Sequence, residues 1–331
     1  MAALILTDGC LLPKRELVSY GEYMRVIEVP QYGSADVLHE VERDTPDAGP
    51  GKARVAVAAT TLNPIDVDIR AGAFPIPALE LPFVLGWDLA GTLLDDLDGL
   101  RAGQRVVAMV PWMDVPASGT NADVVLVEPE WVAALPDDAD VIAAATLPLN
   151  GLTARQTIDL ARVEAGQTVF VDRGSAGVGG FAVQIAAARG GRVVAVAADE
   201  GDAAYVAGLG AEQVVARGEP AALIDAVRRF APGGVDVAID TSGVGAPLLG
   251  VVRDSGAFVT VAGPAPDAER EIRVERQSVV PDREQLASIV AEHEAGTLTT
   301  RVADTLPLSQ AAEAHRRLEA GGVRGKIVLT T

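Results

Sequence analysis

A glycine cluster at the junction of a strand-like and a helix-like segment constrains the fold of this chain more than any other feature. Residues 171–200 read VDRGSAGVGGFAVQIAAARGGRVVAVAADE, so an apolar run precedes the cluster, and an alanine-rich segment and a β-branched run follow it. Gly177 and Gly179 allow a tight turn and let the backbone approach a ligand without a Cβ in the way. The first turn of the following helix offers free N–H groups to an anion. This order of elements predicts a dinucleotide-binding loop made of Ser175, Gly177, Val178 and Gly179.

The residues after the cluster keep alternating between strand-like and helix-like segments. QVVA at 213–216, VDVAID at 235–240 and AFVTVAG at 257–263 are short apolar runs separated by helical patterns. Apolar strands without alternation, placed between helices, are typical of a parallel sheet with helices on both faces. We therefore predict an α/β fold with a doubly wound, Rossmann-type parallel sheet over residues 150–283.

The residues before the cluster have a different rhythm. ARVAVAATTL, LAGTLL, QRVVAMV and ADVVLVE are strand-like by length and β-branched content, and Pro and Gly are dense between them. We predict a β-rich domain over residues 24–149. Residues 1–23 lack the basic region and the long apolar region of a secretion signal. We expect an N-terminal extension or leader there, and an ordinary N-terminal arm stays open as the alternative.

Charge and cysteine content limit the partners and the compartment. The chain has 331 residues with 27 Lys and Arg against 46 Asp and Glu, a net charge of −19. Such an acidic surface repels nucleic acid and anionic membranes, so we expect neither as a partner. The single cysteine, Cys10, excludes an internal disulfide and fits the cytoplasm. The three histidines lie far apart and away from Cys10, so no zinc site of ordinary spacing is expected.

The choice between NAD and NADP depends on the residues after the second strand of the predicted sheet. Asp199 lies 20 residues after Gly179, where a carboxylate would hold a ribose 2′-hydroxyl and favour NAD. Arg217, at the end of the next strand, could reach the same pocket and would favour the 2′-phosphate of NADP. These residues leave both cofactors open.

Several motifs in the same order resemble one known family. They are LNPIDVDIRAG, LPFVLGWDLAG, AGQRV, LPLNGLTA, GSAGVGGFAVQIA, LGAEQVV, VDVAIDTSG and PLSQAAEAHRRLEAGGVRGKIVL. Together they resemble the zinc-independent quinone oxidoreductase branch of the medium-chain dehydrogenase/reductase superfamily, from about residue 24 to the C-terminus. The resemblance implies a GroES-like catalytic domain joined to a Rossmann domain, with residues 284–331 returning to the catalytic domain.

The resemblance also implies an activity. Zinc alcohol dehydrogenases of the superfamily carry Cys and His where this chain has Asn63 and Trp87, so we expect an enzyme without zinc. The usual activity of the branch is hydride transfer from NADPH to a quinone or an α,β-unsaturated carbonyl, and NADH stays open. Relatives commonly form homodimers through the edge of the Rossmann sheet, and we expect the same here.

Matching positions imply roles for single residues. Asn63 matches an Asn that lines the nicotinamide cleft, and Thr153 matches a Thr beside the nicotinamide. Asp202 falls where NADP-preferring relatives often carry Lys, and this difference argues against a preference for NADP. Arg217 partly restores the case for that preference. We also assign Gly263, after the last strand of the sheet, to the cofactor site.

Without a metal, the chemistry would rest on positioning and on polar groups in the cleft. Asn63 could stabilise negative charge on a carbonyl oxygen. Asp68 is the candidate proton donor if an apolar cleft raises its pKa, with a surface or ribose-binding role as the alternative. Trp87, Trp112 and Met113 are candidate walls of a pocket for a planar substrate.

Further expectations concern the remaining charged and imidazole groups. We expect Asp88 and Arg70 to form a structural ion pair, and the three histidines to lie on surface or helix faces without a role. Two other functions stay open: an enoyl reductase that tailors a polyketide-type intermediate, and a cofactor-binding scaffold without catalysis.

Overall fold

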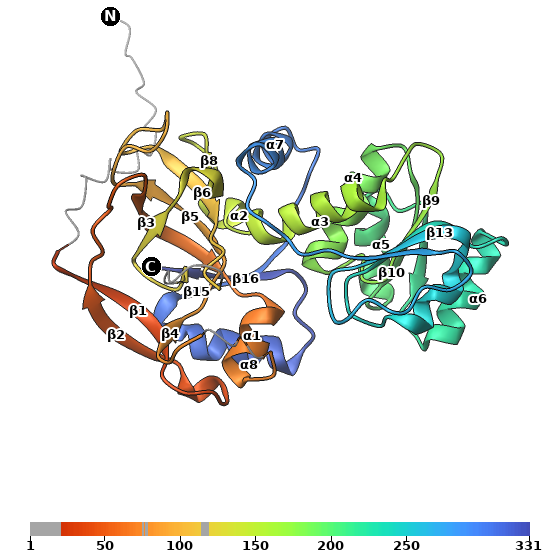
Figure 1. Ribbon diagram of the computed structural model, residues 1–331, viewed down its shortest axis with the longest axis horizontal. Helices are drawn as coiled ribbons and strands as arrows, with labels where there is room; N and C mark the ends of the chain where they lie inside the picture. The colour runs from red at the N-terminus through yellow and green to blue at the C-terminus, as the bar shows by residue number, and fades with distance from the viewer. Residues whose placement is uncertain (1–20, 75, 77–78, 114–118) are drawn as a thin grey trace, which may run out of the picture.

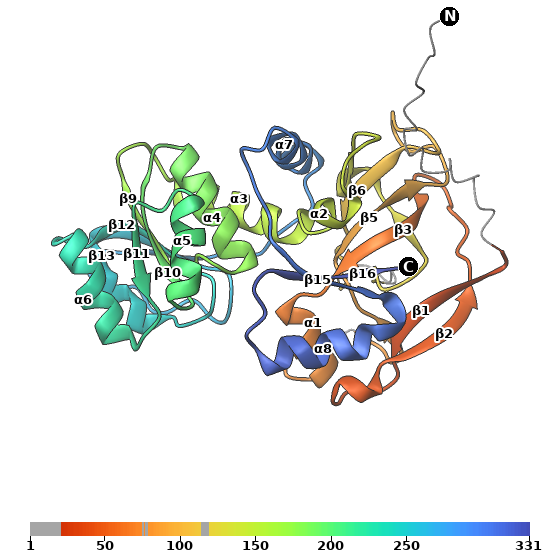
Figure 2. The same cartoon turned by 180° about the vertical axis from the view of Figure 1, so that it is seen from behind.

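The protein has two lobes that meet along one side of a long central helix. The computed structural model describes residues 21–74, 76, 79–113 and 119–331. In Figure 1 the β-rich lobe lies on the left and the parallel-sheet lobe on the right, and Figure 2 shows the same division from behind. Most of the predicted extension, residues 1–20, lies outside the described residues. Within the described part of the chain, no helix is both long and apolar enough to cross a membrane.

The β-rich lobe contains two sheets. A seven-stranded sheet has the order β15-β16-β3-β5-β6-β8, with β7 paired to β3, and a three-stranded sheet has the order β2-β1-β4. Apolar side chains of β3, β5 and β6 are buried in a common core. Along the first part of β3, buried side chains alternate with half-buried ones, whereas β5 and β6 are buried at almost every position. The strands are β1 (Tyr23–Val29), β2 (His39–Asp44), β3 (Ala53–Thr61), β4 (Phe83–Val84), β5 (Asp88–Leu93), β6 (Arg105–Met109), β7 (Val124–Val127), β8 (Val132–Ala134), β15 (Val302–Pro307) and β16 (Lys326–Thr330).

The second lobe is a parallel sheet of order β11-β10-β9-β12-β13-β14, as the strand-and-helix alternation predicts. The strand order reverses at β9, so a crevice for a ligand is expected at the carboxyl ends of β9 and its neighbours. The strands are β9 (Thr168–Val171), β10 (Arg192–Ala197), β11 (Gln213–Ala216), β12 (Val235–Asp240), β13 (Val252–Thr260) and β14 (Arg273–Arg276), and helices α4 (Gly177–Ala188), α5 (Glu200–Gly208) and α6 (Pro220–Phe230) connect the first of them.

The chain crosses between the lobes twice. Helix α2 (Val141–Ala144) and helix α3 (Pro148–Ala161) lead into the parallel-sheet lobe. After β14, helix α7 (Arg283–Glu294) packs on α3, and β15 and β16 then enter the β-rich sheet, where β16 pairs antiparallel with β3. Helix α8 (Ala311–Ala320) lies between these two strands in the chain. The last strands therefore start at the boundary between the lobes.

One helix in the β-rich lobe is absent from the sequence prediction. Helix α1 (Pro64–Ala71) begins at a proline, and Asn63 and Asp66 form a capping box at its start. Proline at the first helical position and such a box are helix-start signals. The surrounding Pro- and Gly-rich sequence hid them.

Two expectations about the β-rich lobe are wrong. His315 on α8 is fully buried and not on the surface, because α8 packs against α1. Arg70 pairs with Glu319 of α8 and not with Asp88. Residues 249 positions apart cannot be paired from the sequence, and this contact depends on the return of the chain to the first lobe.

Candidate active site

The carboxyl edge of the parallel sheet gathers the predicted cofactor residues. The loop of Ser175 follows β9, Asp199 follows β10, and Arg217 follows β11. Ala197 pairs with Ala216 in register, so Asp199 and Arg217 leave the sheet at the same edge. Gly263 lies beyond the end of β13, close to Gly243, which follows β12. The fold therefore brings these predicted positions to the carboxyl edge of one sheet.

The predicted phosphate loop ends at an uncapped helix start. Helix α4 begins at Gly177, and the residue before it, Ala176, offers no side chain as a cap. Its first-turn N–H groups are therefore available to a ligand. A Cβ on Gly179 would lie 1.8 Å from the carbonyl oxygen of Arg173, so no other residue fits at this position. The backbone at Gly179 thus lies close to the backbone at Arg173, as expected for the tight turn that the sequence predicts.

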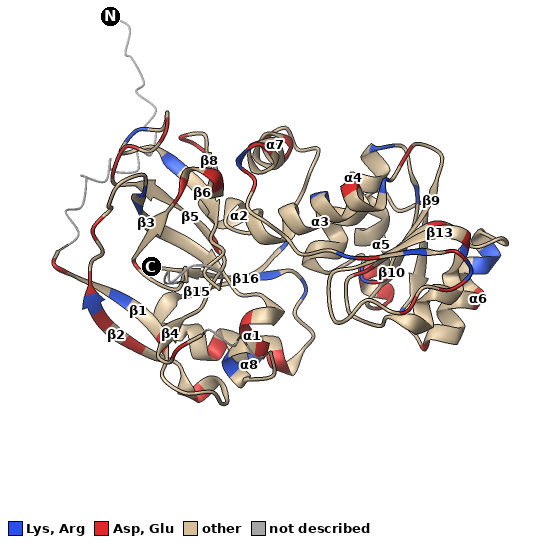
Figure 3. Cartoon of the chain, viewed as in Figure 1, with Lys and Arg blue, Asp and Glu red and all other residues tan. Residues whose placement is uncertain are grey.

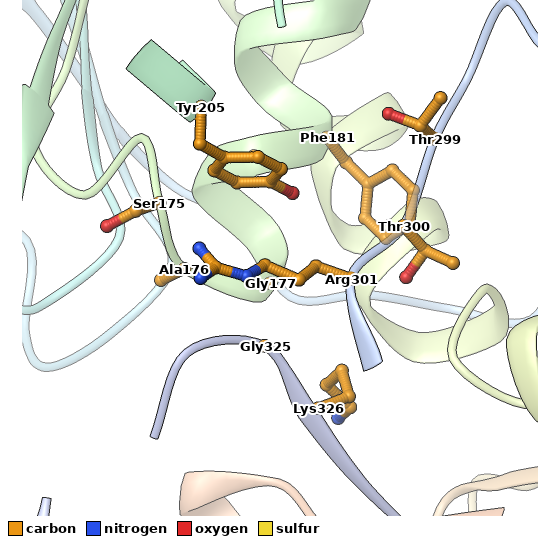
Figure 4. A pocket seen from close by; sticks show the side chains of 11 residues that line it. Ser175, Ala176, Gly177, Phe181, Tyr205, Thr299, Thr300, Arg301, Gly325 and Lys326 are labelled. Carbon is orange, nitrogen blue, oxygen red and sulfur yellow. The ribbon is translucent and has the colours of Figure 1, made fainter. Parts of the chain in front are cut away.

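The loop faces the last strands of the other lobe across a narrow cavity. The cavity has a volume of about 20 Å³ and is lined by the loop, by Tyr205 and by the starts of β15 and β16. This is room for roughly one water molecule. Figure 4 shows the Arg301 side chain extending toward Ser175 and Ala176, with Lys326 below it. A nucleotide diphosphate at this loop would thus meet cationic side chains of the β-rich lobe.

Asn63, the predicted nicotinamide-cleft residue, is the centre of a buried polar network. Its Nδ2 donates to Oδ2 of Asp88 over 2.9 Å, and its Oδ1 accepts from Nζ of Lys326. Asn150 of α3 also donates to Oδ1 of Asn63, and the same Asn150 lies where a Cβ on Gly177 would touch it. The network therefore connects the cleft of the β-rich lobe with the phosphate loop.

The charges beneath Asn63 are enclosed. The Oδ1 atom of Asp66 has no hydrogen-bond partner among the described residues, while its Oδ2 accepts from the N–H of Asn63. Burial raises the pKa of Asp66 to about 7. Burial lowers the pKa of Lys326 below its usual value, although the nearby carboxylates of Asp88 and Asp66 act to raise it. We call Asn63, Asp66, Asp88 and Lys326 the inner cluster.

The remaining predicted residues occupy three kinds of place. Thr153 is buried on α3 and donates to the carbonyl of Leu149. Trp87 and Trp112 are buried together with ring centroids 6.0 Å apart, and Met113 packs beside the same core. Asp68 lies on the exposed face of α1. It therefore lacks the apolar surroundings on which its predicted role as an acid depends.

The aromatic pair belongs to a larger aromatic group with unused donors. Phe83 stacks on Trp112 with centroids 5.8 Å apart, and Tyr32 contacts Phe83. Among the described residues, none accepts a hydrogen bond from the buried indole N–H groups of Trp87 and Trp112. Because buried donors are usually satisfied, a ligand oxygen that reached these two N–H groups would find donors ready to bind it.

A second set of charges lies at the exposed end of the crevice. Asp202 of α5 accepts hydrogen bonds from Arg301 over 2.9 Å and from Arg324 over 3.2 Å. Arg324 also donates to Asp199, whose other carboxylate oxygen caps α5. Figure 3 shows Lys and Arg positions, in blue, beside β16 at the boundary of the two lobes. We call Asp199, Asp202, Arg301 and Arg324 the outer cluster.

Sequence reasoning missed four residues of this site. Asn150, Lys326, Arg301 and Arg324 lie in quoted or neighbouring motifs, yet their positions at the crevice depend on contacts between segments far apart in the chain. The sequence signal that could have indicated them is the concentration of basic residues around the starts of the last two strands, at 301, 324 and 326.

A zinc ion does not fit the residues of this cleft. Where zinc ligands would be expected, Asn63 offers an amide already engaged by Asp88 and Lys326, and Trp87 offers only an N–H donor. Among the residues that the structure describes, no group of three or more His, Cys, Asp or Glu side chains could hold a metal ion.

Comparison with known proteins places this geometry in context. A family model described as "Alcohol dehydrogenase GroES-like domain" matches residues 49–137, and one described as "Zinc-binding dehydrogenase" matches residues 209–329. The quinone oxidoreductase of Coxiella burnetii has a similar structure, with a TM-score of 0.84 and 28% identity over 93% of this chain and 99% of that chain. The predicted fold class, a GroES-like lobe with a Rossmann-like parallel sheet, is confirmed.

Two plant enzymes are similar over part of their length. The chain is 31% identical over 149 residues to the 2-methylene-furan-3-one reductase of Solanum lycopersicum, which is 43% of this chain and 38% of that protein. It is 30% identical over 155 residues to the chloroplastic NADPH-dependent alkenal/one oxidoreductase of Arabidopsis thaliana, which is 45% of this chain and 38% of that protein. The matched part spans well under two thirds of either relative.

Proposed function

Since this chain belongs to the quinone oxidoreductase branch of the medium-chain dehydrogenase/reductase superfamily, we propose that it is a reductase that uses NADPH to reduce the C=C bond of an α,β-unsaturated carbonyl, or a quinone. The observation that carries the proposal is the junction of an uncapped glycine loop with the Asn150–Asn63–Lys326 network. It joins an anion-binding helix start to a second, enclosed polar site within one crevice. The name of the Arabidopsis thaliana relative supports NADPH as the reductant. The names of both plant relatives support a conjugated carbonyl as the substrate.

The chain's own residues would hold the cofactor from both lobes. The N–H groups at Gly177, Val178 and Gly179 would bind the diphosphate, and Lys326 would face it from the start of β16. Thr153 and Asn150 lie on α3 where the nicotinamide end of the crevice is expected. The bound nicotinamide supplies a hydride. The protein's contribution is to orient the two reactants and to exclude water.

The polar groups of the cleft would have different roles in the reaction. The Asn63 amide is engaged by Asp88, Lys326 and Asn150, so we assign it a positioning role and not the direct stabilisation of an oxyanion. The positive charge of Lys326 favours negative charge that develops nearby. The Trp87 and Trp112 N–H groups, which bond to no described residue, would be donors to the substrate. With Asp68 exposed, the proton at the α-carbon would come from solvent.

We further propose that the reaction proceeds without zinc. The argument is the chemistry of the donors, because an engaged amide and an indole N–H cannot replace a thiolate and an imidazole as zinc ligands. Elemental analysis of the purified active protein should find no stoichiometric zinc, and chelators should leave turnover unchanged. Zinc at one ion per chain together with loss of turnover on chelation would contradict this part.

We propose a homodimer as the functional assembly. Strand β14 is at the end of the six-stranded sheet, and Val274 is half-buried at this edge. An edge strand can pair with the same strand of a second copy. Light scattering should give twice the chain mass, and Val274→Pro should give monomers because proline cannot donate to a strand pair.

Adjacent glycines of α4 provide a matched test of the cofactor site. Gly179→Ala should abolish NADPH binding, because its Cβ would overlap the Arg173 carbonyl oxygen. Gly180→Ala is the control, since its Cβ meets nothing closer than 3.5 Å and its N–H already bonds to Ala176. Fluorescence titration with NADPH and an enone turnover assay measure both variants. Equal binding by the two variants would contradict the proposed loop, and wild-type binding without turnover on enones or quinones would favour a scaffold.

A further inference from the structure

We propose that Arg324 and Arg301, reaching across the crevice from the β-rich lobe and held side by side by Asp202, form the binding site for the 2′-phosphate of NADPH. The proposal rests on the proposed function, because it names the residues that choose between two cofactors at the same site. It assigns the choice to a pair of arginines from the other lobe, whereas the sequence pointed to Arg217 at the end of β11.

The two arginines come together through the register of the last strands. Arg301 immediately precedes β15, and Arg324 lies two residues before β16. The N–H of Lys326 donates to the carbonyl of Arg301 over 2.8 Å, which ties the two strand starts together. Both guanidinium groups therefore leave the same edge of the β-rich sheet and point at the start of α5.

The segment before β15 is fixed to the parallel-sheet lobe, so Arg301 has a defined place. The Gln184 side chain of α4 donates to the Thr299 carbonyl and accepts from the Thr299 N–H. The Arg301 guanidinium lies over the ring of Tyr205, 4.8 Å from its centroid. These contacts hold the arginine beside the phosphate loop, as Figure 4 shows.

The start of α5 is where the adenosine ribose is expected in a fold of this type, because the diphosphate rests on the preceding glycine loop. Asp199 is the residue that would hold the ribose hydroxyls of NAD. One of its carboxylate oxygens accepts from the Asp202 N–H at the helix start, and the other accepts from Arg324. Asp199 is thus already engaged, and the groups at this place that can bind a further anion are the remaining N–H donors of the Arg301 and Arg324 guanidinium groups.

Exposure separates the two carboxylates. The Asp202 side chain is 3% exposed and is shared by both arginines. Burial opposes its ionisation, but Arg301 and Arg324 outweigh burial and hold the pKa of Asp202 below its usual value. The Asp199 side chain is 51% exposed and Arg324 is 43% exposed. We infer that an incoming phosphate replaces Asp199 on Arg324, while Asp202 stays and acts as the positioning residue for both arginines.

Charge favours this exchange for NADPH over NADH. The four side chains sum to no net charge, so a carboxylate that rotates into solvent leaves one positive charge for the phosphate. A phosphate offers three acceptor oxygens to the planar guanidinium groups, and such charge-assisted hydrogen bonds are stronger than neutral ones. NADH carries only a hydroxyl there and gains nothing from breaking the Arg324–Asp199 pair.

Binding measurements on six single variants test the inference. Dissociation constants for NADPH and NADH are measured by nicotinamide fluorescence, with 2′,5′-ADP and 5′-ADP as fragment probes that need no turnover. Arg324→Gln and Arg301→Gln should each weaken NADPH and 2′,5′-ADP roughly 10- to 100-fold and change NADH less than about threefold. Asp202→Asn should lower the NADPH/NADH preference in the same direction, which a purely structural role would not do.

Asp199→Asn gives a prediction of opposite sign. Asn keeps the helix cap, because Asn and Asp are equivalent at this position. The exchange removes the charge that competes with the phosphate for Arg324, so NADPH should bind several-fold more tightly. Arg192→Gln is the control, since Arg192 pairs with Glu212 at the far end of β10. It should leave both affinities unchanged.

Three outcomes would overturn the inference. The arginine variants could weaken NADPH and NADH equally, or Arg217→Gln alone could remove the preference. Wild-type protein that binds both nucleotides equally also contradicts it, while leaving the proposed reductase intact. If folded wild-type protein binds neither nucleotide, the proposed function fails together with this inference. Thermal unfolding of each variant identifies those that do not fold, and for these Arg→Lys replaces Arg→Gln.

Discussion

The inner and outer clusters are both made of acids and bases at the boundary of the lobes, yet their surroundings differ. Lys326, Asp66 and Asp88 are buried in the β-rich lobe. Each of the three forms a hydrogen bond with Asn63. In the outer cluster, Arg324 and Asp199 are about half exposed. A buried charge that loses its partner is strongly destabilising, whereas an exposed one is rehydrated. The inner cluster is therefore a fixed frame, and the outer cluster can exchange partners with a ligand.

The largest expected effect comes from breaking the inner cluster. Lys326→Met removes the cation that faces two buried carboxylates and the hydrogen bond to Asn63. The free energy of unfolding, measured by urea denaturation, should fall by about 3–5 kcal/mol.

A second lysine provides the control for this experiment. Lys52 pairs with Glu128 at 3.0 Å, and both side chains are partly exposed. Lys52→Met should cost less than about 1 kcal/mol. Equal losses for the two variants would show that the inner cluster is not a frame.

An intermediate effect is expected from His315, a buried base whose ring nitrogens bond to no residue in the described part of the chain. Burial lowers the pKa of His315 from 6.5 to about 3, and the positive charge of Arg70 contributes to the same shift. The negative charge of Glu319 acts in the opposite direction. Between these values the unfolded chain binds a proton that the folded chain does not, so stability falls as the pH falls below about 6.5. The loss approaches about 1.4 kcal/mol per pH unit.

Replacement of the histidine isolates this contribution. His315→Leu should remove up to about 2 kcal/mol of the difference in unfolding free energy between pH 6.5 and about pH 5. His39 is exposed on β2, so His39→Leu should leave that difference in place. An unchanged pH dependence of stability in the His315 variant would mean that this side chain of α8 is not enclosed where α8 packs on α1.

The smallest effect on stability is expected from the outer cluster. Arg324→Gln breaks an exposed ion pair with Asp199 and one with the buried Asp202, which keeps Arg301 as its partner. The free energy of unfolding should therefore fall by less than about 1 kcal/mol. The comparison between the clusters is sharpest here, because the same variant is expected to change cofactor preference strongly. A loss as large as that of Lys326→Met would place the outer cluster in the frame as well.

Local patterns in the sequence predicted the parts of this protein that depend on neighbouring residues. The turn at Gly177 and Gly179, the buried strands around it and the parallel sheet follow from strand and helix periods and from the space that glycine leaves. The family resemblance then supplied the arrangement of the lobes and the place of Asn63 in the cleft.

Contacts between distant segments decided what the sequence could not predict. Lys326 reaches Asn63 across 263 positions, and Arg70 reaches Glu319 across 249. Asp88 lies next to Trp87 in the motif, but its partners, Asn63 and the N–H of Leu149, are fixed only once β5, α1 and α3 meet. For the same reason, the sequence motif favours Asp68 as an acid, whereas in the structure Asp66, two residues before it, is the buried carboxylate.

Deuterium transfer tests the central claim most directly. The protein is incubated with NADPH carrying deuterium at C4 of the nicotinamide and with a conjugated enone, and the product is analysed by mass spectrometry and NMR. The account predicts one deuterium on the β-carbon of a saturated ketone, formed by protein without zinc. An allylic alcohol with deuterium on the carbonyl carbon, or transfer that depends on a bound metal, would contradict it.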